Sequence, residues 1–190
     1  MSPNSWFSQP VYIPGGDPEN MNEPSLLYPG QLGIRFAYKN PPRTQPSGTT
    51  GQGTPKAYKL VQTDSSMATA PYDGAVAWFA NQGTYLVTTT IATLGRGRIA
   101  GVFRRTSGGT ITPGNFTCVQ VKGLGMTKLT DGSINSTGVG EFVQPSATNG
   151  KAEVVAAGTE ADYPPLGRGA GMINIPAREA LVDLDVPEVL

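Results

Sequence analysis

The sequence of 190 residues contains no histidine and a single cysteine, Cys118. The absence of histidine excludes Ser-His-Asp and Cys-His catalysis, histidine-ligated zinc and the most common general base. A single cysteine cannot form a disulfide within the chain. The fold is therefore not that of a small secreted domain held together by disulfides.

The chain also lacks an excess of charge of either sign and a long apolar run. It carries 14 basic and 14 acidic residues, and only 15% of its residues are charged. This composition lacks the basic patches of nucleic-acid-binding proteins and of membrane-surface segments, so we expect neither partner. The longest apolar run, residues 75–80, is too short to span a bilayer. No signal-peptide pattern is visible in the first twenty residues.

Glycine and proline are abundant instead, with 25 and 17 residues respectively. They favour turns and irregular segments over long helices. Ten of the prolines lie in residues 1–55, which predicts an extended N-terminal arm over residues 1–40 with a short strand within 31–40. Residues 41–55 contain no large apolar side chain and predict a flexible linker or loop.

Large apolar side chains recur along the arm, which is unusual for a solvated linker. They can cover the edge of the chain's own β-domain, or they can anchor the arm in a neighbouring molecule, where buried aromatic residues dominate binding energy. Both readings stay open. The candidate interface residues are Trp6, Phe7, Tyr12, Ile13, Leu26, Leu27 and Tyr28.

Residues 56–190 show the pattern of a β-domain, with short apolar runs separated by Gly, Pro, Asn and Asp turns. The predicted strands cover residues 57–63, 83–93, 98–106, 116–123, 140–147, 150–158 and 179–186, and residues 74–80 are either a strand or a short helix. The expected fold is all-β: a small β-barrel or sandwich-like domain preceded by an extended, Pro-rich N-terminal arm.

The strand that contains Cys118 follows the turn Thr112-Pro113-Gly114-Asn115. Its alternation places Phe116, Cys118 and Gln120 on one face and Thr117, Val119 and Val121 on the other. A buried cysteine that acts as a small apolar residue is the usual case, and no histidine is present to activate the thiol.

Other candidate chemistry is weak. The glycine-rich residues 95–101 open a strand rather than a helix, so they form no phosphate cradle. With Arg104 and Arg105 they form a local basic cluster, for which a solvated hairpin is favoured over contact with an acidic neighbour. Asp183 and Asp185 share a strand face that is best explained as a solvated edge. We expect no catalytic residues, no metal and no cofactor. The acidic residues considered for a glycosidase pair, none in a recognisable motif, are Asp64, Asp73, Asp131, Glu141, Glu153, Glu160 and Asp162.

Residues 100–169 resemble the capsid decoration (cement) proteins of tailed bacteriophages, and the closing residues 180–186 extend the likeness. The elements that carry the resemblance are Gly101-Val102, the turn 112–115, Val119 to Gly123, Val143 to Ala152, and Ala157 to Arg168. Cys118 stands where the family pattern has a bulkier residue, and the Pro-rich arm lies outside the shared pattern. These elements are turns and strands, not catalytic motifs.

The resemblance implies a non-enzymatic virion protein, made in the bacterial cytoplasm, that binds the outer surface of the expanded capsid. It would clamp neighbouring subunits of the major capsid protein and would itself form a homo-oligomer, a trimer. The alternative is a host-surface or glycan-binding module of the phage head or tail, with exposed aromatic residues such as Trp78 or Tyr163 as a stacking platform. A carboxylate-dependent hydrolase is the third and weakest hypothesis.

Overall fold

The computed structural model describes residues 17–26, 29–38, 43–44, 50–51, 56–91, 99–130, 139–155, 163–174 and 177–186. Within these ranges the regular elements are β-strands and the 3-10 helix η3 (Pro29–Gln31). Because these elements are strands apart from one short 3-10 helix, the predicted all-β class is confirmed. None of the helical structure described here is long and apolar enough to cross a membrane.

The strands vary widely in length, from two residues to thirteen. They are β1 (Arg35–Tyr38), β2 (Arg43–Thr44), β3 (Thr50–Gly51), β4 (Lys56–Thr63), β5 (Val76–Asn81), β6 (Leu86–Thr88), β7 (Ile99–Phe103), β8 (Phe116–Lys128), β9 (Phe142–Pro145), β10 (Ala152–Val154), β11 (Gly167–Asn174) and β12 (Glu179–Asp185).

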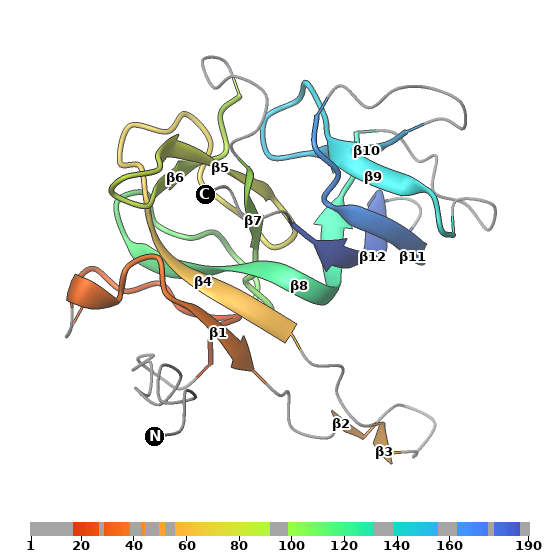
Figure 1. Cartoon of the computed structure of the whole chain (residues 1–190), viewed down its shortest axis with the longest axis horizontal. Coiled ribbons are helices and arrows are strands. Elements are labelled where there is room, and N and C mark those ends of the chain that lie inside the picture. Colours follow the sequence, from red (N-terminus) through yellow and green to blue (C-terminus); the bar gives the residue numbers. More distant parts are fainter. Residues whose placement is uncertain are drawn as a thin grey trace, which may run out of the picture.

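Five of these strands close into a barrel in the order β4, β6, β5, β7 and β8, because β8 pairs back with β4 (Figure 1). The pairings are antiparallel except between β4 and β6, which run parallel where Gln62 lies opposite Leu86. Closure gives β4 and β8 hydrogen-bonded neighbours on both edges, which removes the exposed edges of an open sheet.

The long strand β8 belongs to both halves of the molecule. Its first half pairs with β4 and β7, and its second half, from Lys122 to Lys128, pairs with β12. The sheet then continues through β11, β9 and β10. A parallel bridge between Leu129 and Ala152 links β10 back to the end of β8. A second group of strands, at the right in Figure 1, is thus joined to the barrel through one shared strand.

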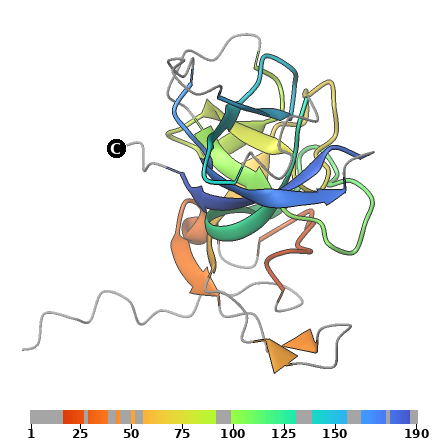
Figure 2. The same ribbon diagram turned by 90° about the vertical axis from the view of Figure 1, so that its right-hand side faces the viewer.

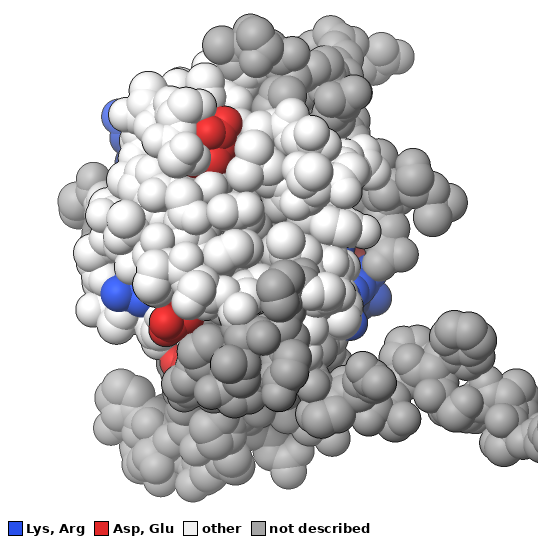
Figure 3. Space-filling model, turned by 90° about the vertical axis from the view of Figure 1, so that its left-hand side faces the viewer, with Lys and Arg blue, Asp and Glu red and all other residues white. Residues whose placement is uncertain are grey.

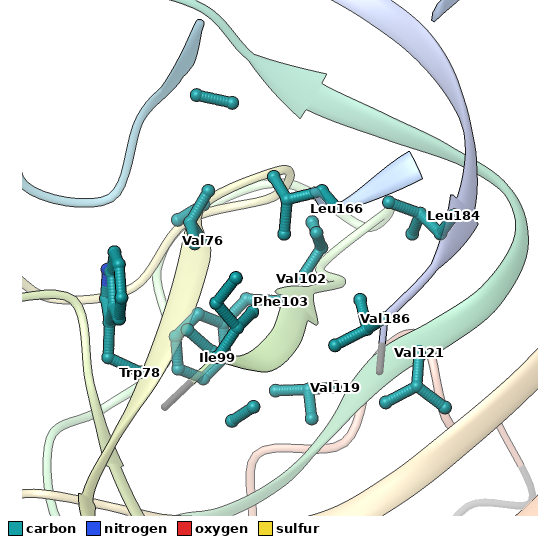
Figure 4. Close-up of a cluster of buried hydrophobic side chains, with 14 of the residues drawn as sticks. Val76, Trp78, Ile99, Val102, Phe103, Val119, Val121, Leu166, Leu184 and Val186 are labelled. Atoms are coloured by element: carbon teal, nitrogen blue, oxygen red, sulfur yellow. The ribbon is translucent and has the colours of Figure 1, made fainter. Parts of the chain in front are cut away.

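Two apolar clusters lie on opposite faces of β4 and β8. The larger one, the inner cluster, extends from the barrel into the second group of strands, and its side chains include Trp78, Phe103 and Val119 (Figure 4). The smaller one, the outer cluster, consists of Met21, Tyr58, Leu60 and Cys118, with Leu26, Leu32, Phe36 and Phe116 packed against it. Figure 2 shows β1 and the residues that precede it on the opposite side of β8 from the barrel.

The alternation predicted for the Cys118 strand is confirmed. Phe116 and Cys118 lie in the outer cluster, whereas Val119 and Val121 lie in the inner one. Residues 74–80, left open between strand and helix, contain most of β5. The turn at Asn149-Gly150 joins β9 to β10. Gly150 has a φ of 68°, the left-handed conformation that such a hairpin turn needs.

Two strand predictions need correction. The strand predicted over 83–93 is wrong in extent, because within the described residues 83–91 only Leu86–Thr88 forms a strand and Tyr85 has a left-handed φ of 53°. Strand β11 was not predicted, since its sequence is rich in glycine, which has low strand propensity. A Cβ atom at Gly167 would lie 2.0 Å from the carbonyl oxygen of Asp183 on the paired strand, so this close approach requires glycine.

The N-terminal predictions fall partly outside the described residues. Arm residues 1–16 are outside, whereas β1 lies within the predicted arm and pairs with β4. Within the predicted linker at 41–55, the described residues form β2 and β3, which pair antiparallel.

Candidate functional site

The part of the molecule richest in polar contacts is where residues 17–23 lie against the barrel; we call these residues the strap. The strap begins in a turn in which the Asp17 carboxylate accepts hydrogen bonds from the Glu19 amide (2.9 Å) and the Asn20 side chain (2.6 Å). It ends at Glu23, whose amide and carbonyl both bond to the backbone of Phe116 at 3.0 and 2.8 Å. The strap therefore continues the sheet by one bridge at the start of β8.

Glu19 is the buried acid of the strap, with 1% of its surface exposed. One of its carboxylate oxygens accepts hydrogen bonds from Lys56 Nζ and from Tyr58 Oη, both at 2.6 Å. Burial raises the pKa of this carboxyl, but the hydrogen bonds from Lys56 and Tyr58 and the charges of Lys56 and Arg104 outweigh it, so the pKa of Glu19 is lowered. Glu19 is thus a carboxylate at neutral pH that β4 holds in place.

Tyr58 lies on β4 and is fully buried in the outer cluster. Burial, together with the hydrogen bond and charge of Glu19, raises the pKa of the Tyr58 hydroxyl far above its usual range. The tyrosine remains a neutral donor, which fixes the direction of its hydrogen bond to Glu19.

A second set of buried polar side chains connects the segment after β7 to residues 122–124 of β8, which we call the bend of β8 because Gly123 has a left-handed φ of 84° there. Arg104 Nε donates to Asp73 Oδ1 at 3.0 Å, and a terminal guanidinium nitrogen donates to Gln120 Oε1 at 3.2 Å. The Gln120 amide nitrogen is 3.0 to 3.1 Å from the carbonyl oxygens of Lys122, Gly123 and Leu124. The predicted solvated hairpin is therefore wrong for Arg104, which is buried, while residues 95–98 lie outside the described part of the chain.

Cys118 lies beneath the strap. Its side chain is fully buried, and its Sγ atom is 3.7 Å from Sδ of Met21. Burial raises the pKa of the Cys118 thiol far above neutral pH, so the thiolate needed for nucleophilic chemistry does not form in the closed structure. Cys118 packs as a small apolar residue, the reading that the strand pattern favoured.

Of the candidate interface residues, only Leu26 lies in the described part. It is half-buried and packs against the outer cluster of its own chain. The remaining candidates, Trp6, Phe7, Tyr12, Ile13, Leu27 and Tyr28, lie outside the described residues.

The aromatic platform suggested for glycan binding is wrong for Trp78. This residue is fully buried in β5, with Tyr163 packed edge-on at 5.4 Å between ring centroids, and Tyr163 is itself half-buried. Trp78 belongs to the inner cluster, and Tyr163 packs against that cluster. Both faces of β5 are buried around Trp78, so its ring is not available to a ligand.

The acidic candidates are dispersed. Asp64 bonds to Ser66, Asp73 to Arg104, and Glu153 to Gln144. Asp183 and Asp185 are both exposed on β12, as expected for a solvated face. Among the residues that the structure describes, no three metal-ligating side chains gather into a group. Asp131, Glu160 and Asp162 lie outside them.

Sequence reasoning missed the exposed apolar side chains near the start of β9. Val139 and Phe142 have exposed fractions of 59% and 45%. The guanidinium of Arg168 lies 4.2 Å from the centre of the Phe142 ring and donates to the carbonyl of Gly140 at 2.8 Å. This cation–π contact holds the aromatic ring at the surface. Phe142 is followed directly by the buried residues of β9, so the pattern alone did not separate it from the core.

Figure 3 shows one side of the molecule, the left-hand side in Figure 1, where few charged groups appear and those are scattered. A surface of this kind can be buried in an assembly at little cost in charge desolvation. In the comparisons with known proteins, no family model, curated protein or solved structure matches this chain.

Proposed function

We propose that the protein is a non-enzymatic structural component of a tailed bacteriophage, which binds the outer surface of the expanded capsid. The proposal starts from the resemblance of residues 100–169 to capsid decoration proteins. It is supported by where those residues lie: they contribute β7, β8, β9 and β10 and the start of β11, the scaffold of a closed barrel with its attached strands.

The observation that carries the proposal is that the potentially reactive side chains of the described core make structural contacts. Glu19, Arg104 and Cys118 are all buried, and each is occupied by contacts that hold the strap or the bend of β8. These groups serve the folded structure, so binding in this proposal takes place through the outer surface of the molecule. Multivalent attachment of such bodies to a lattice stabilises the assembled state by mass action.

In this proposal the barrel would sit between neighbouring major capsid protein subunits, as a trimer, with the residues before the strap lying across them. The sparsely charged side in Figure 3 and the exposed Val139 and Phe142 are the surfaces available for such contact. Large apolar side chains at the centre of an interface carry most of its binding energy.

Co-sedimentation with capsids tests the proposal. Full-length protein and a variant lacking residues 1–16 are mixed with expanded and unexpanded capsids of the parent phage. We place the truncation before Asp17 because the strap and β1 contact the barrel directly. Saturable pelleting with expanded capsids only is the expected result, and weaker pelleting of the truncated protein would assign residues 1–16 to the interface. Absence of pelleting with either capsid would rule out the capsid-binding function.

The second candidate, a host-surface or glycan-binding module, is favoured by one observation, the exposed Phe142 ring backed by Arg168. Exposed aromatic rings stack against sugar faces as they do against other ligands. Saturable binding of the protein to host cells, lost in Phe142→Ala and retained in the matched control Ile34→Ala, would support this candidate. Ile34 is a suitable control because it is exposed to 38% on another part of the surface.

A further inference from the structure

The strap and the barrel interior do not share a hydrophobic core. The buried inner cluster contains no strap residue, whereas the outer cluster contains Met21. Removal of the strap would therefore leave the packing of the barrel interior unchanged. Elements with few buried apolar contacts open locally at a lower free energy than the whole domain.

Most contacts of the strap are polar and involve loop residues. The Glu19 carbonyl accepts from the Thr106 amide, the Asn20 side chain accepts from the Ser107 amide, and the Asn22 side chain accepts from the Thr112 amide. Water can replace each of these bonds when the strap leaves, so their net contribution is small. Met21 and Glu19 are the strap side chains whose burial opposes release.

We propose that the strap is a releasable latch, which detaches from β4 and β8 as a unit while the barrel stays folded. Release would uncover the Cys118 thiol, the Tyr58 hydroxyl and the backbone groups of Phe116 that now pair with Glu23. The start of β8 would stay paired with β4 in the open state and would lose only the bridge between Phe116 and Glu23. This conformational change does not depend on the proposed capsid function.

Cys118 is a built-in reporter of this opening, since it is the only cysteine of the chain and lies under Met21. Its rate of reaction with an aromatic disulfide reagent, divided by the rate for the chain unfolded in denaturant, gives the fraction of open molecules. Hydrogen exchange at the amide of Phe103, which bonds to the Ala75 carbonyl at 2.8 Å, reports opening of the barrel in the same sample.

In the full-length protein we expect Cys118 to become accessible at least tenfold more often than the Phe103 amide. Glu19→Gln removes the charge that Lys56 and Tyr58 hold, so it should raise the labelling rate of Cys118 about tenfold or more without changing exchange at Phe103. The matched control is Glu179→Gln, which removes an ion pair with Lys128 on the other half of the molecule and should leave labelling unchanged.

Equal opening frequencies at Cys118 and Phe103 in the wild-type protein would overturn the proposal, because Cys118 would then react only after global unfolding. An equal increase in labelling for Glu19→Gln and Glu179→Gln would overturn it as well. If Glu19→Gln fails to fold, the wild-type comparison still decides. Asn22→Ala, which removes bonds to Thr112 and Asn115, then serves as a milder variant for which faster labelling is expected.

Discussion

The two faces of β4 and β8 are made by the same strands but are covered in different ways. On the inner face, Val61 and Val119 meet apolar side chains from the other barrel strands. On the outer face, Tyr58 and Cys118 are covered by Met21 of the strap, a segment almost one hundred residues from Cys118 in the chain. The inner face is stabilised by a large apolar cluster, whereas the outer face combines a smaller apolar cluster with a buried acid and its hydrogen bonds. The same two strands thus contribute one face to the inner cluster and the other face to the surface that the strap covers.

The largest effect is expected for Phe103→Ala, which removes a fully buried ring from the inner cluster. We expect the free energy of unfolding to fall by about 3–5 kcal/mol, from lost burial and from the cavity left behind. Urea unfolding followed by circular dichroism measures it. A loss below about 1 kcal/mol would mean that packing on the inner face does not contribute more stability than packing on the outer face.

A pH-dependent effect is expected on the outer face. Glu19 faces Lys56 and Tyr58 from β4, Arg104 from the segment after β7, and Asp17 on its own strap. Its lowered pKa means that its contribution to stability is complete above the ordinary carboxyl pKa of 4.5 and is lost as the pH falls through the folded-state value. Charged hydrogen bonds of this kind contribute about 1.5–3 kcal/mol.

Urea unfolding of wild-type protein and Glu19→Gln at pH 7 and at pH 3 measures that contribution. The difference between the two proteins should be largest at pH 7 and should shrink at pH 3. A difference that is independent of pH would show that the carboxylate charge does not hold the strap.

Gly125→Ala tests the point where the two halves share β8. A Cβ atom there would lie 2.8 Å from Gln120 Oε1 and 2.9 Å from Cδ1 of Leu184. We expect a loss of about 1–3 kcal/mol from overpacking, measured as a lower urea midpoint. Gly30→Ala is the matched control, because a Cβ atom there would meet nothing within 4 Å and Gly30 does not have a left-handed φ. Equal losses in both variants would show that contact with Gln120 and Leu184 is not the cause of the loss in Gly125→Ala.

The smallest effect is expected for Asp185→Asn, which breaks an exposed ion pair with Lys122 at 3.7 Å. Such pairs contribute little because solvent screens them, so the change should stay below about 0.5 kcal/mol. Its urea midpoint gives the baseline against which the buried pair of Glu19 and Lys56 is compared. A larger loss than in Glu19→Gln at pH 7 would reverse the ranking of the two pairs.

Local patterns predicted much of the barrel. The alternation through Phe116, Cys118 and Val119 placed each side chain on the correct face, and the Asn149-Gly150 turn placed the hairpin of β9 and β10. These features depend on residues adjacent in sequence, so the sequence contains the information directly. The left-handed Tyr85, by contrast, interrupts a run whose composition is that of a strand, and its ring occupies the space where a Cβ atom of Gly33 would lie.

The candidate site was much less predictable. Leu26 was selected as an apolar residue, but the polar side chains that attach the strap, Glu19 and Asn22, gave no signal of their own. Arg104 was expected in solvent and is instead buried between Asp73 and Gln120. A polar residue can be buried only where partners converge on it, and those partners come from separate parts of the chain.

The sequence by itself determined the all-β class, the faces of the strands and the positions of the turns, because each follows from a period of two or from the backbone preferences of Gly, Pro and Asn. Only the tertiary structure decided that β4 and β6 pair in parallel, that the glycine-rich β11 is a strand, and that the strap covers Cys118. These features depend on contacts between residues far apart in the chain, and no local pattern encodes the free energy of such contacts.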